Sequence, residues 1–345
     1  MTVYTITATN SVGSTTATLN LSKCVTPTAT WTVETATVTK DLLALYPTAT
    51  AFRFKGVGGG GGGEGGPARQ NATASMYTKP GGSGGGVFDV TVPVSQITAA
   101  VTMTVGAGGI GSDGAKYNAA SAQVALPGGN GGTSQVTVAG IVLTNGSGVQ
   151  ARATGGNGGM DINKLPVWPK GGTGNLATGG EAQGGSGAVS GQPNYYDTSS
   201  FDGAAVRAAA WTVVATGPGA GGTSSGFRTD SVGLAGQSGQ STSTGAVGGA
   251  FGPASTGAVV GARASAGGAG QALADGTLTY GAGGGAGGLG ASATYRGGNG
   301  GDGGFPGGGG GAGAGGTTFN STNPNMTGGI GGDGGAGVVM WIPVY

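Results

Sequence analysis

The stretch Ala51-Phe-Arg-Phe-Lys-Gly-Val-Gly-Gly-Gly-Gly-Gly-Gly63 decides the fold of this chain. In its first half apolar and charged residues alternate, which is typical of a strand with one buried face. Its second half has no side chains, so another backbone can approach from any direction. The stretch therefore predicts a strand that runs directly into a glycine-rich structure.

The distribution of glycine divides the chain at the same place. Of the 87 glycines in 345 residues, only Gly13 lies within residues 1–55. This compositional shift indicates a domain edge. We expect a hairpin segment over 1–25, a β-rich lead-in over 26–55 and a glycine-rich domain over 56–345.

Glycine-rich sequence is also typical of flexible linkers, and this alternative must be weighed. Here the glycine tracts alternate with segments of period-two patterning rich in β-branched and aromatic residues, which predicts strands. These segments are 30–38, 50–57, 87–92, 100–105, 135–143, 211–216 and 338–345. Collagen is excluded because the glycines come in pairs and blocks instead of at every third residue.

The clearest internal repeat is Gly-Gly-Asn-Gly-Gly at 128–132, 155–159 and 297–301. A polyglycine-II helix has three residues per turn and no internal hydrogen bonds, so its backbone must bond to neighbouring helices. Glycine pairs keep the contact directions free, and we expect Asn130, Asn157 and Asn299 to point outward. The predicted fold class is all-β with a polyglycine-II helix bundle and very little α-helix, limited to one short turn at 40–45.

Charge and residue types exclude several functions. The 14 basic and 13 acidic residues form no run of one sign, which argues against a nucleic-acid partner. No apolar stretch is long enough to cross a bilayer, so we expect no membrane insertion. The N-terminus lacks the features of a signal peptide, which predicts a protein that does not follow the ordinary secretory route.

Catalysis is also not expected. The chain has no histidine, which removes the commonest general base and metal ligand. Cys24 is the only cysteine, so no intramolecular disulfide can form. We expect no catalytic residue, no cofactor and no metal site. Gly-Gly-X-Gly-X-Asp occurs at 108–113, 297–302 and 328–333, and we interpret these aspartates as turn residues.

Three motifs in a fixed order carry a family resemblance. They are the stretch at 51–63, Val101-Thr-Met-Thr-Val-Gly-Ala-Gly-Gly-Ile-Gly111, and Gly328-Gly-Ile-Gly-Gly-Asp-Gly-Gly-Ala-Gly-Val-Val-Met-Trp-Ile342. Over residues 30–345 the chain resembles the glycine-rich domain of bacteriophage tail fibres and minor tail proteins. It is also similar to the polyglycine-II tip adhesins of T-even-like phages. The resemblance implies a virion protein, assembled in the host cytoplasm, whose loops at one end bind a receptor on the bacterial surface.

Residues 2–22 resemble the last hairpin of an immunoglobulin-like domain. The matching positions are Tyr4, Ala8, Asn10 and Gly13, and the preceding strands of such a domain are missing. A single hairpin is marginal alone. We therefore expect this attachment segment to pair with another protomer or with another tail or fibre protein.

The candidate receptor-binding residues lie where the glycine pattern is interrupted. Loops on a rigid scaffold are where binding residues concentrate, and aromatic rings and arginines suit a glycan or an outer-surface protein. The candidates are Arg69, Tyr77, Tyr117, Lys164, Trp168, Lys170, Tyr195, Tyr196, Phe201, Arg207, Phe227 and Arg228. The alternative for several of these rings is packing between protomers.

Two other functions remain open from the sequence. A purely structural tail-tip or fibre component would use the same scaffold. A polyglycine-II ice-binding protein of the springtail type would need a strict Gly-X-X register, which the block at 58–63 breaks. A homotrimer is favoured, because fibre proteins with marginal single-chain cores gain stability by association.

Overall fold

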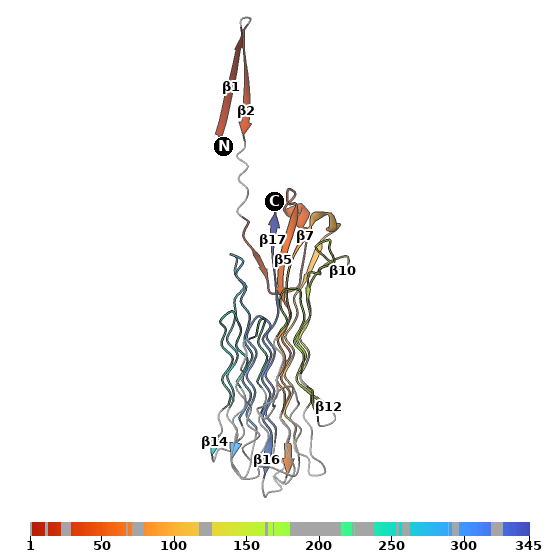
Figure 1. Cartoon of the computed structure of the whole chain (residues 1–345), viewed down its shortest axis with the longest axis vertical. Helices are drawn as coiled ribbons and strands as arrows, with labels where there is room; N and C mark the ends of the chain where they lie inside the picture. The colour runs from red at the N-terminus through yellow and green to blue at the C-terminus, as the bar shows by residue number, and fades with distance from the viewer. Residues whose placement is uncertain are drawn as a thin grey trace.

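The computed structural model describes residues 2–10, 13–21, 29–66, 68–70, 79–116, 126–162, 165–167, 169–179, 215–222, 224, 238–252, 255–256, 263–288, 290–291, 297–318 and 327–345. These residues form two larger antiparallel sheets at one end of the molecule and a long glycine-rich body beneath them (Figure 1). The hairpin of β1 (Thr2–Asn10) and β2 (Gly13–Leu21) projects from the sheet end, away from the body. We call the opposite end of the body the distal end. Almost no helix is present in the described residues, so the all-β class is confirmed.

The first sheet is built around the strand that the sequence predicts before the glycine block. β5 (Ala51–Val57) pairs with β17 (Val338–Val344) on one side and β7 (Val87–Pro93) on the other, and β3 (Thr32–Glu34) pairs with β17. Phe52 and Phe54 are fully buried whereas Arg53 between them is exposed, as the alternation requires. The strand ends at Val57, and the glycine block begins with the next residue.

The second sheet has the order β10 (Ile141–Val142), β9 (Ser134–Val138), β8 (Val101–Thr104), β4 (Val38–Lys40), and β11 (Arg152–Ala153) also pairs with β9. Two predicted strands are corrected here. The segment 30–38 contains a bend between β3 and β4, and 135–143 is a hairpin. Its turn has Ala139 and Gly140 at φ 48° and 80°, a left-handed turn that the apolar pattern running through it conceals.

An apolar core holds the two sheets together. Trp341 lies at its edge, where its indole N–H donates to Glu34 Oε1 at 3.0 Å, and the same carboxylate pairs with Lys40. The expected turn at 40–45 is confirmed as α1 (Leu42–Leu45), whose first turn is capped by Asp41, and a short 3-10 helix, η1 (Val94–Gln96), follows β7. The buried members of the core are Leu42, Ala49, Phe52, Phe54, Phe88, Val90, Val92, Ile97, Val101, Met103, Val136, Val138, Leu143, Ala151, Ala153, Val339 and Trp341.

Below the sheets the chain crosses the body repeatedly in extended segments that lie side by side (Figure 1). The segment 58–66 shows how they are joined. Gly58, Gly61 and Glu64 donate their backbone N–H groups to segment 79–86, Gly59 and Gly62 donate to 127–132, and Gly60, Gly63 and Gly66 donate to 328–337. Gly65 instead donates to Ser112 Oγ. The carbonyl groups of 58–66 accept from 105–115, 154–159 and 307–315. Within the described residues this segment therefore bonds to six neighbours.

Side chains are excluded from these contacts. A Cβ atom on Gly59 would lie 2.0 Å from the carbonyl oxygen of Ala107, and one on Gly60 would lie 2.0 Å from that of Gly308. A Cβ atom on Gly61 would lie 2.1 Å from the carbonyl oxygen of Asn157. Because consecutive residues face different neighbours, glycine is required on every side of the segment.

The repeat positions are placed as follows. Asn130 and Asn157 are exposed, as expected, whereas Asn299 is half-buried. The interpretation of the motif aspartates as turn residues is wrong. Asp113 and Asp333 are exposed residues within extended segments, not in turns. Each stands at one of the positions, three residues apart, where the side chain faces outward. Asp302 is placed in the same way.

Short strand pairs lie toward the distal end. β6 (Ala68–Gln70) pairs in parallel with β16 (Gly316–Thr318), β14 (Ser255–Thr256) pairs in parallel with β15 (Gly290–Ala291), and β12 (Met160–Ile162) forms a hairpin with β13 (Leu165–Val167). Of the segment expected as a strand at 211–216, residues 211–214 lie outside the described residues, and Ala215 forms an isolated bridge with Thr242.

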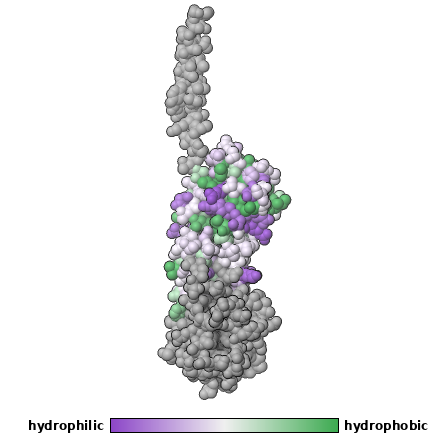
Figure 2. Space-filling view, in the orientation of Figure 1, coloured by the Kyte–Doolittle hydropathy of each residue, from purple (hydrophilic) through white to green (hydrophobic). Residues whose placement is uncertain are grey.

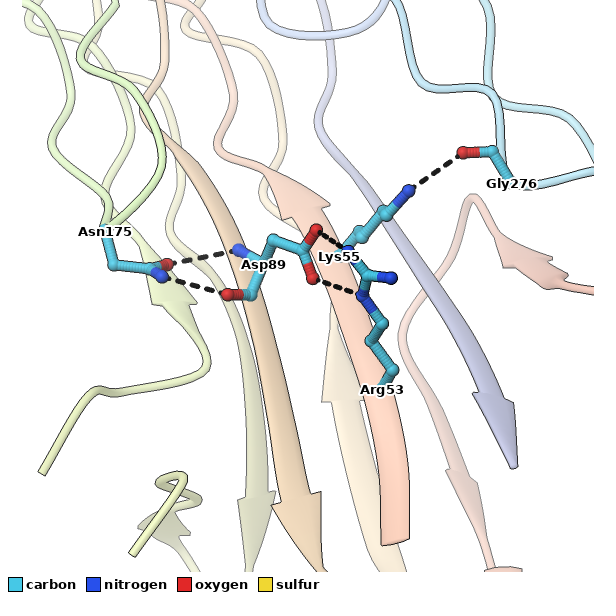
Figure 3. A network of polar contacts seen from close by, with 5 residues as sticks. All are labelled: Arg53, Lys55, Asp89, Asn175 and Gly276. Carbon is cyan, nitrogen blue, oxygen red and sulfur yellow. Dashed lines mark hydrogen bonds and ion pairs between the residues drawn. The ribbon is translucent and has the colours of Figure 1, made fainter. Parts of the chain in front are cut away.

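A polar network joins the first sheet to the body (Figure 3). Arg53 of β5 makes two hydrogen bonds to Asp89 of β7, at 2.8 and 2.7 Å, which raise the pKa of the guanidinium. The backbone of Asp89 exchanges two hydrogen bonds with the side chain of Asn175, which belongs to the body. Lys55 donates to the carbonyl of Gly276 at 3.0 Å. The network fixes two turns of the body against the sheet.

Substitution of Gly60 by alanine tests the packing of the body. The added methyl would collide with the backbone at Gly308, so neighbouring segments would have to move. We expect Gly60→Ala to destabilise the protein by about 1–3 kcal/mol or more in chemical unfolding. Ala107→Ser, at an exposed position of a neighbouring segment, is the control and should change stability by less than about 0.5 kcal/mol. Equal effects of the two substitutions would contradict this packing.

Tyr280 provides a pH test of the junction. Its ring packs with Val57 and Val87 under the sheet, and this burial raises the pKa of the phenol, with a further rise from the charge of Asp89. The folded state thus prefers the neutral phenol. This contribution is complete below the ordinary pKa of about 10 and is lost as the pH rises through that value toward the folded-state pKa. Between about pH 9 and pH 11 the unfolding free energy of the wild type should fall more steeply than that of Tyr280→Phe. Parallel curves would refute the assignment.

Candidate functional site

The distal end is the candidate site, because the chain stretches that carry many of the candidate residues begin and end near it. We call the described residues on either side of such a stretch its flanks. The flanks of residues 71–78 are Gln70, at the end of β6, and Lys79, and those of residues 117–125 are Lys116 and Leu126. Ser224 precedes another such stretch, residues 225–237. The sheets and the β1–β2 hairpin lie at the other end (Figure 1).

Beneath this end the glycine-rich interior contains a buried ion pair and buried hydroxyl groups. Glu64 and Lys79 form an ion pair, with Nζ and Oε1 2.8 Å apart and side chains only 1% and 2% exposed. Ser112 and Ser224 are buried beside them. We call these four residues the polar layer.

The polar layer ties together the chain flanks of three stretches. The Glu64–Lys79 pair joins the end of segment 58–66 to the start of segment 79–86. Lys79 and Ser224 exchange two hydrogen bonds, in which the Lys79 N–H donates to Ser224 Oγ at 3.0 Å and the Ser224 N–H donates to the Lys79 carbonyl at 2.9 Å. These contacts hold the flanks of residues 71–78 and 225–237 side by side.

Ser112 performs the same role for residues 117–125. Its Oγ accepts the backbone N–H of Gly65 at 2.6 Å and donates to the carbonyl of Leu126. Ser112 precedes Lys116, and Leu126 is the first residue described after 117–125. The hydroxyl therefore bridges both flanks of this stretch to segment 58–66.

Two of the twelve candidate receptor-binding residues lie within the described part of the chain. Arg69 lies in β6 at the distal end, in register with Thr317 of β16. Lys170 is exposed on the side of the body, where its carbonyl accepts from Asn157 N and Ser83 Oγ, at the level of Gly61. The other ten lie outside the described residues: Tyr77, Tyr117, Lys164, Trp168, Tyr195, Tyr196, Phe201, Arg207, Phe227 and Arg228.

One stretch differs from the others in where its flanks lie. Gly179 donates its N–H to Gly172 O, and Ala215 bridges to Thr242 close to the turn at 243–245. Both flanks of 180–214 are thus placed nearer the sheets than those of the stretches at the distal end. The candidates Tyr195, Tyr196, Phe201 and Arg207 belong to this stretch.

Sequence reasoning missed the polar layer, although a signal was present. Glu64 is the only residue other than glycine within 58–66, and only Pro80 separates Lys79 from the next glycine tract. A lone charge inside a tract that packs on all sides must be buried, and buried charges are paired. This argument would have linked the two residues.

Among the described residues no three His, Cys, Asp or Glu side chains are grouped as metal ligands, and no helix there is long and apolar enough to span a membrane. Hydrophilic and hydrophobic residues are mixed over the sheet end on the face seen in Figure 2. No known family model matches this chain, and no curated protein matches its sequence.

Breaking the buried ion pair should be costly. Glu64→Gln leaves the Lys79 ammonium buried without its counter-charge, and we expect a loss of about 3–5 kcal/mol in unfolding free energy. The double variant Glu64→Gln, Lys79→Met should recover a large part of it, because no charge is then left buried.

The matched control is the exposed pair of Arg263 and Asp302, whose charged atoms are 4.0 Å apart. Arg263→Met should change the unfolding free energy by less than about 1 kcal/mol, because exposed pairs contribute little. A Glu64→Gln variant as stable as the control variant would show that the pair is not a structural element of the distal end.

Proposed function

We propose that this protein is a bacteriophage tail-fibre or tail-tip protein that recognises a bacterial surface receptor with its distal end. The receptor would be a glycan or an outer-surface protein, and the protein would act by adsorption without catalysis. The observation that carries the proposal is the separation of the two ends by a body of hydrogen-bonded glycine segments, with the attachment hairpin at one end and the flanks of candidate stretches at the other (Figure 1).

The proposal includes the finer identity of the body. Its extended segments would be polyglycine-II helices, which repeat every three residues. Supporting this, Gly58, Gly61 and Glu64 donate to one neighbour and Gly60, Gly63 and Gly66 to another. Gly109, Ser112 and Ala115 donate at the same spacing to Gly60, Gly63 and Gly66. Such a lattice is stiff because each segment is bonded laterally along its whole length.

A stiff body suits receptor recognition for an energetic reason. Binding costs free energy for every group that becomes ordered, so a scaffold that positions its binding stretches in advance keeps more of the interaction energy. The polar layer contributes here, because it fixes the flanks of 71–78, 117–125 and 225–237 to one another. The candidates Arg69, Tyr77, Tyr117, Phe227 and Arg228 follow or lie between those flanks.

The other end would provide attachment to the virion. β1 and β2 pair over their full length, with Thr2 opposite Leu21 and Asn10 opposite Gly13. A two-stranded hairpin without further strands is marginal in water, so a partner strand or sheet would stabilise it. We assign to this segment the contact with another tail or fibre protein. Any homotrimer would also form through this segment.

The test is adsorption of the purified full-length protein to a panel of bacterial strains that lack defined surface glycans or outer-surface proteins. We expect binding to susceptible strains and loss of binding in one class of receptor mutant. Phe227→Ala, Arg228→Ala and Tyr77→Ala should weaken it, with an effect of about tenfold or more where a residue is a hot spot.

Leu45→Ala is the matched control, because Leu45 is exposed on α1 at the sheet end. It should bind like the wild type. Absence of binding to every susceptible strain would refute the adhesin function. Binding that is lost only in variants of the sheet end would instead favour a structural component of the fibre.

A further inference from the structure

One face of the body is made by four segments that are bonded in a row. Segment 328–337 bonds to 105–115 on one side and to 297–304 on the other, and 263–270 bonds to the far side of 297–304. Within the described residues, 105–115 bonds to only three segments, whereas 58–66 in the interior bonds to six. This face is therefore a surface at which the hydrogen-bonded lattice stops.

Side chains stand on this face at every third residue. Ile110 and Asp113 project from the first segment, Ile330 and Asp333 from the second, and Asn299 and Asp302 from the third. We call these six residues the outer row. Ile110 is 74% exposed and Ile330 is 45% exposed, although both are large apolar residues. Burial in the protein's own core does not explain their presence here.

Three of the four polar members of the outer row accept backbone N–H groups from neighbouring segments. Asn299 Oδ1 accepts from Ile330 N at 3.0 Å, and Asp302 Oδ1 accepts from Asp333 N at 3.0 Å. Asp333 Oδ1 in turn accepts from Gly111 N at 2.7 Å. Inside the body, donors of this kind go to the carbonyl groups of the next segment. On this face the side chain takes the place of a further segment.

Without the outer row, the face would present glycine backbone with free donors. That is the surface onto which a further glycine segment packs inside the body, and a second copy of the chain carries the same surface. Unprotected backbone donors at the edge of a sheet are a known route to association, and proteins block them with charges and side chains.

We propose that the outer row terminates the glycine lattice and prevents a second copy of the chain from docking on this face. The inference does not depend on receptor binding.

The decisive experiment compares two six-fold variants of the full chain. One replaces the outer row with glycine, and the other replaces the same residues with alanine. Both remove the side-chain acceptors, but alanine keeps a Cβ. At a lattice contact a Cβ lies too close to the opposing backbone, as at Gly111, where it would be 2.0 Å from Gly331 O. Sedimentation velocity measures the mass of each variant against the wild type.

We expect the glycine variant to form species of at least twice the wild-type mass as its concentration rises, and the alanine variant to keep the wild-type mass. The proposal is overturned if the folded glycine variant keeps the wild-type mass. It is also overturned if the alanine variant associates equally, or if cross-linking of the wild type already joins two copies through this face.

If the six-fold variant fails to fold, a single substitution tests whether the Asp333 side chain protects the Gly111 amide. Asp333→Ala should speed hydrogen exchange at the Gly111 amide by about five- to tenfold, as expected for a lost hydrogen bond. Asp333→Asn keeps the acceptor and should leave exchange near the wild-type rate. Equal exchange at Gly111 in all three proteins would show that Asp333 caps nothing, and the proposal would fall with it.

Discussion

Backbone N–H and C=O groups in the glycine-rich body can be satisfied only by other segments of the body, and the rest of the structure depends on this constraint. The extended segments of the body bond to one another and not within themselves. Each buried donor must then meet an acceptor on a neighbour, in most cases a carbonyl and for Gly65 the Ser112 hydroxyl, because an unpaired buried amide is costly. For 58–66 this requires six neighbours within the described residues, and each contact excludes a side chain. Glycine is thus needed for close approach, not for flexibility.

Such a body cannot order itself cheaply, and the two ends explain how it is held. Ordering a glycine backbone costs more than ordering any other residue, whereas one hydrogen bond contributes a net gain of about 0.5–1.5 kcal/mol. At the sheet end, an apolar core and the Arg53–Asp89–Asn175 network fix the starting register of several segments. At the distal end the polar layer does so again through an ion pair and two serine hydroxyls. Segment 58–66, which follows β5, and segment 79–86, which precedes β7, are thus aligned at both ends, and the bonds between can form in register.

The sequence predicts those parts of the fold that have a local signal. The strand at 51–57 follows from its alternation, and the change to glycine segments follows from the loss of side chains at residue 58. The hairpin turn at Ala139 was missed because its apolar pattern continues through a left-handed turn. The distal pairing of Glu64 with Lys79 and of Ser112 with Leu126 depends on which segments become neighbours. Several neighbour pairs are more than 200 residues apart in the chain, so no local pattern encodes them.

The order of segments in the body also explains a division between positions that can vary and positions that cannot. A substitution at Gly60 or Gly61 places an atom about 2 Å from another segment's carbonyl, so it disturbs two segments at once. At exposed positions of the described segments, such as Ala107, a side chain meets no such restriction. If the proposed receptor recognition holds, a protein that must follow changes in a bacterial receptor would benefit from this separation. New side chains could then be tried at unrestricted positions while the bonds that hold the body remain unchanged.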